Sequence, residues 1–134
     1  MLYSFPLFLI TFAIYNMVAF LTPGVSWTGT IFSVAMQSGA TWAVTAGDCL
    51  IALALVFLLF EVLKATRSYS RTIVDHMLST LVFIAALVEF LLVKEAATSV
   101  FATLLLISLV DVIGGWTVSM SSARRDIQVD NLPQ

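Results

Sequence analysis

Residues 41–63 read TWAVTAGDCLIALALVFLLFEVL, an apolar run in which Asp48 and Glu61 are the only charged side chains. A helix needs about 20 apolar residues to cross about 30 Å of hydrocarbon, so this run predicts a membrane span. Three further runs fit the same description, at residues 2–21, 77–93 and 97–118. We therefore predict an all-α fold, an integral membrane bundle of four transmembrane helices. It forms a single membrane domain over residues 1–134, with a short polar cytoplasmic tail at 119–134.

The composition agrees with a membrane protein. The chain is 60% apolar and only 10% charged, whereas a soluble domain is about 45–50% apolar and about 25% charged. Its formal net charge of −2 and its lack of a basic stretch predict that nucleic acid is not a partner. No Lys or Arg precedes the first apolar run, which is also longer than a signal-peptide core, so we interpret it as a retained span.

Basic residues predict the orientation. Five of the six lie between the second and third spans or after the fourth, whereas residues 22–40 carry no charge: Lys64, Arg67, Arg71, Arg124 and Arg125. Because basic loops stay in the cytoplasm, we expect both termini there, in a bacterial inner (plasma) membrane. Trp27 and Trp42 then flank the outer surface.

The uncharged segment 24–40 is rich in Ser, Thr and Gly. Its polar residues recur at spacings of four, three and four, as on one face of a helix: Ser26, Thr30, Ser33 and Gln37. We expect a short amphipathic helix lying in the outer interface. The alternative is a re-entrant helix whose hydroxyl stripe lines a polar path. A fifth span or an irregular loop are the other options.

Three acids lie inside apolar runs that contain no Lys or Arg: Asp48, Glu89 and Asp111. A carboxylate at the centre of a membrane helix costs about 2.5–3.5 kcal/mol on insertion scales, so such residues usually face protein, water or a partner. Asp48 and Glu89 could share a layer in the outer leaflet. The functional interpretation is that these acids bind a proton or a cation. The structural interpretation is that Asp48 bonds Thr45 or the Ser/Thr stripe, and that Asp111 bonds Ser108 or a hydroxyl on another span. Glu89 can in that case reach the outer headgroups and Lys94.

The other polar residues point away from catalysis. Glu61, at the cytoplasmic end of the second span, is expected to be hydrated, and His76 is expected to be a solvated cap at the membrane edge. His76 is the only histidine and Cys49 the only cysteine, so bis-histidine haem ligation within the chain and a CxxC motif are excluded. With no phosphate-binding glycine loop either, we expect no enzyme, no cofactor and no metal site.

These observations favour a non-catalytic accessory or structural subunit of a larger membrane protein complex. Its expected partners are the lipid bilayer and other membrane protein chains, in a hetero-complex or a homo-oligomer. The alternative is a homo-oligomeric proton- or cation-coupled transporter or ion channel that uses the intramembrane carboxylates. A holin-like pore former is the third hypothesis. In size and span count the chain is similar to small multidrug exporters, although their first-span acid has no counterpart within residues 2–21.

One face of the first span carries bulky apolar residues at helical spacing: Phe5, Phe8, Leu9 and Phe12. We expect this stripe to contact lipid or to dock on a partner.

Overall fold

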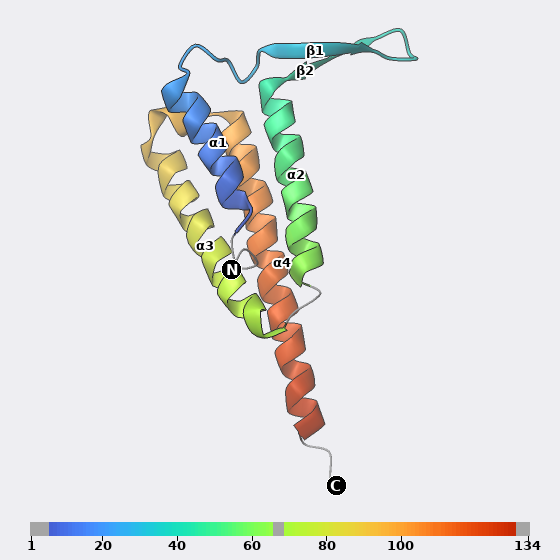
Figure 1. Ribbon diagram of the computed structural model, residues 1–134, viewed down its shortest axis with the longest axis vertical. Helices are drawn as coiled ribbons and strands as arrows, with labels where there is room; N and C mark the ends of the chain where they lie inside the picture. The colour runs from blue at the N-terminus through green and yellow to red at the C-terminus, as the bar shows by residue number, and fades with distance from the viewer. Residues whose placement is uncertain (1–5, 66–68, 131–134) are drawn as a thin grey trace.

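The computed structural model describes residues 6–65 and 69–130, and it describes their side chains except at 65, 69–73, 118, 119 and 121–130. Four α-helices form a bundle, and a two-stranded β-hairpin lies across one end of it (Figure 1). The elements in chain order are α1 (Phe8–Leu21), β1 (Thr30–Ala35), β2 (Thr41–Thr45), α2 (Ala46–Ala65), α3 (Tyr69–Leu92), the 3-10 turn η2 (Lys94–Ala96) and α4 (Ser99–Asp130). We call the end that carries the hairpin the hairpin end.

Within the described residues, three helices are long and apolar enough to cross a membrane. Their candidate spans are Ala46–Lys64, Val74–Leu92 and Ser99–Thr117. The fourth helix, α1, is also apolar but has 14 residues, which at about 1.5 Å per residue is about 21 Å long. The three longer spans agree with the prediction from hydropathy, whereas the first predicted span appears as this shorter helix.

The prediction of a helix within residues 24–40 is wrong, because the segment forms a loop, β1 and the tight turn that leads to β2. Both strands are rich in β-branched and aromatic residues, which favour extended backbone. Gly39 takes the positive φ of 82° in the turn, where the Met36 N–H donates to the Ala40 carbonyl at 2.8 Å. The strands pair antiparallel, with a bulge between Thr30 and Phe32. The second predicted span consequently begins as strand, and α2 starts only at Ala46.

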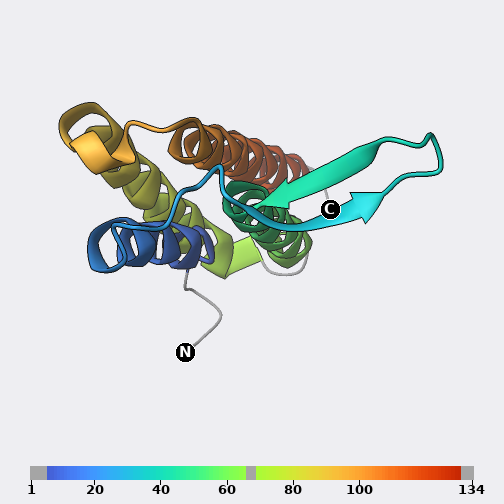
Figure 2. The ribbon, with the colours of Figure 1, turned by 90° about the horizontal axis from the view of Figure 1, so that it is seen from above.

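The bundle is organised around α4. This helix packs against α2 and against α3, its antiparallel neighbour across η2, and α1 closes the remaining side (Figures 1 and 2). The core lies between α1, α2 and α4 and consists mainly of Phe8, Phe12, Tyr15, Leu50, Ala54, Phe101 and Leu104. Phe8 and Phe12 are buried inside the bundle, so the expectation that they face lipid or a partner is wrong. Phe12 instead packs against Phe101, with ring centroids 5.3 Å apart.

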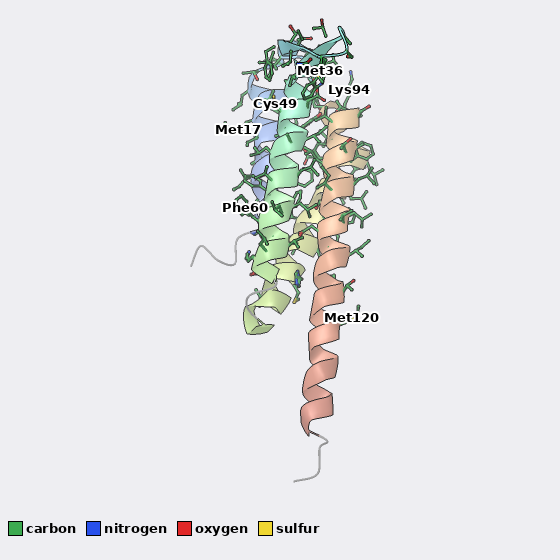
Figure 3. All side chains as sticks on the ribbon, turned by 90° about the vertical axis from the view of Figure 1, so that its right-hand side faces the viewer. Met17, Met36, Cys49, Phe60, Lys94 and Met120 are labelled. Carbon is green, nitrogen blue, oxygen red and sulfur yellow. The ribbon has the colours of Figure 1, made fainter. Side chains whose placement is uncertain are left out.

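The two ends of the bundle differ. Figure 3 places Met36, Cys49 and Lys94 at the hairpin end and Met120 toward the opposite end, beyond which α4 continues past the other helices. Helix α4 extends to Asp130, so residues 119–130 of the predicted polar tail are helical. The side chains of Arg67, Arg71, Arg124 and Arg125, on which the predicted orientation depends, lie outside the described ones.

Candidate polar sites in the bundle

Asp48 forms the start of α2. Its Oδ2 accepts hydrogen bonds from the Thr45 N–H at 2.9 Å and from the Thr45 hydroxyl at 2.7 Å. The Asp48 N–H in turn donates to Thr45 Oγ1 at 3.1 Å. This reciprocal arrangement is a capping box, which satisfies backbone donors at a helix N-terminus and places a negative charge where the helix dipole favours it. Asp48 is exposed, and Thr45 is the partner that the structural interpretation anticipated.

Glu89 lies near a second polar group, the tyrosine layer, which we define as Tyr15, Glu95 and Thr98. The fully buried Tyr15 donates its hydroxyl to the Glu95 carbonyl at 2.9 Å. The same hydroxyl lies 2.7 Å from Thr98 Oγ1, which accepts the Phe101 N–H at 3.1 Å. The half-buried Glu89 carboxylate is close enough to Tyr15 to interact with it electrostatically. The tyrosine layer thus ties α1 to η2 and to the start of α4.

Aromatic rings fix Tyr15 in this position. Trp27 stacks on the Tyr15 ring, with centroids 4.6 Å apart and an angle of 8° between the planes. Phe101 meets the same ring edge-on at 4.8 Å. Both geometries are favourable for aromatic pairs. Tyr15 has no role predicted from sequence, because one tyrosine in an apolar span carries no signal of its own.

The end of the bundle away from the hairpin contains the polar cluster, which we define as Glu61, Lys64, Asp75, His76 and Asp111. Glu61 is 8% exposed, and its Oε1 accepts the Leu7 N–H at the start of α1, at 2.8 Å. Lys64 lies 3.4 Å from Glu61 Oε2 and 3.3 Å from Asp75 Oδ2. These contacts connect α1, α2 and α3. The expectation that Glu61 is hydrated is therefore wrong.

Asp111 belongs to this cluster. It is 9% exposed, is hydrogen-bonded to the Ser79 hydroxyl, and interacts electrostatically with Glu61 and Lys64. Ser79 lies on α3, so the partner is the hydroxyl on another span that the structural interpretation offered beside Ser108. The bond joins the two helices that form the antiparallel hairpin.

His76 is buried as well, with 8% of its surface exposed, so its predicted role as a solvated cap is wrong. Gly115 allows this burial, because a Cβ added there would collide with the imidazole ring. His76 Nε2 and Asp75 Oδ1 are buried and have no hydrogen-bond partner in the structure. The cluster therefore contains three carboxyl groups, one ammonium group and an imidazole with a free ring nitrogen.

The structure does not bring the three predicted acids together. Asp48 is part of the N-terminal cap of α2 at the hairpin end, Glu89 lies beside the tyrosine layer, and Asp111 belongs to the polar cluster. Between the last two lies an apolar core that includes Phe12, Phe101 and Leu104. Among the described residues, no group of three or more His, Cys, Asp or Glu side chains is arranged to hold a metal ion.

The predicted polar stripe is also dispersed. All four of its members are exposed, and they lie in a loop, in β1 and in the turn: Ser26, Thr30, Ser33 and Gln37. Ser26 bonds Thr28 locally, with 2.9 Å between the hydroxyl oxygens. Residues at helical spacing do not share one face in a hairpin, because the residues along one face of a strand are two positions apart.

Comparisons with protein family models, with curated proteins and with solved structures gave no match to this chain.

Proposed function

We propose that this protein is a non-catalytic accessory or structural subunit of a larger membrane protein complex. The observation that carries the proposal is that the polar groups within its apolar helices connect the helices to one another. Glu61 holds the start of α1, Lys64 joins α2 to Asp75 on α3, and Asp111 bonds Ser79 across α3 and α4. Polar residues commonly act this way between membrane helices.

The packing between the two polar groups supports the same proposal. The tyrosine layer and the polar cluster lie at different levels of the bundle, and the core between them is aromatic and aliphatic. A transported ion needs polar groups or water along its route. Between the two levels, the described part of the chain buries isolated hydroxyls such as Thr11, which donates to the Phe8 carbonyl of its own helix at 2.8 Å, and Ser108.

The proposal includes four spans, with both termini in the cytoplasm. Helix α1 begins beside Glu61, which lies four residues before the end of α2 at Ala65. Farther along α1, Tyr15 belongs to the tyrosine layer. The helix therefore runs between the same two polar levels as the longer helices. The basic residues beyond α2 and in the C-terminal part of the chain support the orientation.

The experiment is to determine the native mass of the tagged, full-length chain after extraction from its own membrane in polymer-bounded lipid discs. Co-purifying chains are identified and quantified against an equally tagged, unrelated membrane protein. We expect one or more larger chains in fixed stoichiometry. A monomer or a homo-oligomer without other chains contradicts the subunit proposal.

One observation favours a second candidate function, a proton-coupled transporter. The polar cluster holds more carboxyl groups than cations, and His76 Nε2 has no hydrogen-bond partner. Acidic side chains inside membrane helices often line proton pathways in pumps and transporters. For this candidate, Asp111→Asn abolishes proton flux into liposomes, whereas Asp48→Asn, at an exposed helix cap, leaves it intact. Equal flux in wild type and Asp111→Asn eliminates the candidate.

A further inference from the structure

The β-hairpin has two chemically different faces. Its register places Phe32 opposite Val44 and Val34 opposite Trp42. Because side chains two residues apart share a face of a strand, these four bulky apolar residues form one side of the ribbon, which we call the apolar face. The directly paired residues between and beyond them form the other side and are small: Ser33, Ala35, Thr41 and Ala43.

The apolar face is turned toward the helices. Val44, next to α2, is 6% exposed, whereas the small-face residues Thr41 and Ala43 on the same strand are exposed. Figures 1 and 2 show the hairpin lying across the end of the bundle and reaching sideways beyond α2. On the same face Phe32, opposite Val44, and Trp42, farther from α2 along β2, are 51% and 55% exposed, so the described residues leave much of this face uncovered.

The level of the hairpin identifies what lies beneath it. Strand β2 ends at Thr45 and the candidate span of α2 begins at Ala46, so the ribbon sits where that span begins. A hairpin lying across the helices at this level runs along the membrane surface, and its apolar face is directed at the lipid beside α2. Tryptophan is enriched at this depth because its ring is apolar and its N–H finds polar partners.

Charge and stability both fit a lipid surface. Residues 22–47 contain no Asp, Glu, Lys or Arg, so no charge is brought into the boundary between headgroups and acyl chains. An isolated two-stranded hairpin is marginal in water and needs a surface that covers its apolar face. The open strand edges can bond headgroups and water at that depth, which they could not do deeper in the membrane.

We propose that the apolar face of the hairpin rests on the bilayer surface beside α2 and binds the boundary of headgroups and acyl chains. The contact is apolar and does not select anionic lipids. It anchors the hairpin end of the bundle at a fixed depth. This inference does not depend on whether the chain is an accessory subunit.

Trp42 provides the test. The variant Trp27→Phe with Trp116→Phe leaves Trp42 as the only tryptophan and retains a ring against Tyr15. The full-length variant is reconstituted in phosphatidylcholine discs whose acyl chains carry bromine at a shallow or a deep position. The matched control replaces Trp42 by Phe and adds Ala43→Trp, which moves the fluorophore to the small face one residue away. Circular dichroism verifies that both variants retain the helical content of the wild type.

We expect Trp42 to emit in the blue and to be quenched most strongly by the shallow bromines. The Ala43→Trp control should emit further to the red and respond mainly to iodide in the buffer. Replacing half of the phosphatidylcholine by phosphatidylglycerol, or adding salt, should leave the Trp42 quenching unchanged. Red emission with iodide quenching means that water covers the face, and blue emission without bromine quenching means that protein covers it. Either result overturns the proposal.

Discussion

The hydroxyl of Tyr15 is the most sharply testable link in the bundle. The change Tyr15→Phe keeps the ring between Trp27 and Phe101 and removes only the oxygen that bonds the Glu95 carbonyl at 2.9 Å and Thr98 Oγ1 at 2.7 Å. A hydrogen bond contributes about 0.5–1.5 kcal/mol net. Bonds between membrane helices average about 0.6 kcal/mol. For two such bonds we therefore expect the free energy of unfolding to fall by about 1–2 kcal/mol.

Reversible unfolding in mixed micelles, followed by tryptophan fluorescence, measures this loss. Thr98→Ala removes one of the two partners, so its combination with Tyr15→Phe should cost less than the sum of the single changes. Thr103→Ala is the matched control, because its hydroxyl bonds only the Ser99 carbonyl of the same helix, at 2.8 Å. That change should stay within about 0.5 kcal/mol. If Tyr15→Phe is as neutral as the control, or if its effect adds fully to that of Thr98→Ala, the tyrosine layer does not hold α1 to α4.

Three further predictions concern the two ends of the bundle. Gly115→Leu should displace the His76 imidazole and destabilise the protein by about 1–3 kcal/mol. The neighbouring Gly114→Leu should be tolerated, because a Cβ there meets nothing within 4 Å; equal thermal stability of the two variants would refute the packing of His76. Glu61→Gln should retain an acceptor for the Leu7 N–H, whereas Glu61→Leu should leave this part-buried N–H without an acceptor, at a cost of about 1–3 kcal/mol. Equal unfolding free energies for the two variants would contradict that contact. Thr45→Ala should speed amide exchange over the first turn of α2 and leave α4 unchanged, and unaltered exchange would show that the capping box does not start the helix.

The long helices could be predicted from sequence, since hydropathy over about 20 residues reports membrane spans directly. The β-hairpin was harder to predict from the sequence. The alternation in β1 is interrupted by the bulge before Phe32, and four polar residues happen to recur at helical spacing. The stronger signal lay in the turn, where Ser38-Gly39 separates two stretches rich in β-branched residues.

The polar cluster was less accessible to sequence reasoning. Asp111 stood out because it interrupts a long apolar run. Glu61 and His76 lie near the ends of predicted spans, where residues are usually hydrated, so burial was not expected. Their burial follows from contacts between distant segments, such as the Leu7 N–H that reaches Glu61. Such pairings depend on how the helices pack, which one sequence does not specify.

The contact between Glu61 and the start of α1 has a consequence for biogenesis. Helix α1 precedes α2 in the chain, and the Leu7 N–H at its start finds its acceptor on α2, whereas the Leu9 and Ile10 N–H groups bond the Pro6 and Leu7 carbonyls of the same segment. Glu61 comes near the end of α2, so its carboxylate becomes available only when that helix is almost fully synthesised. We therefore expect α1 to reach its final packing only together with the hairpin and α2, because the acceptor for the Leu7 N–H is made last.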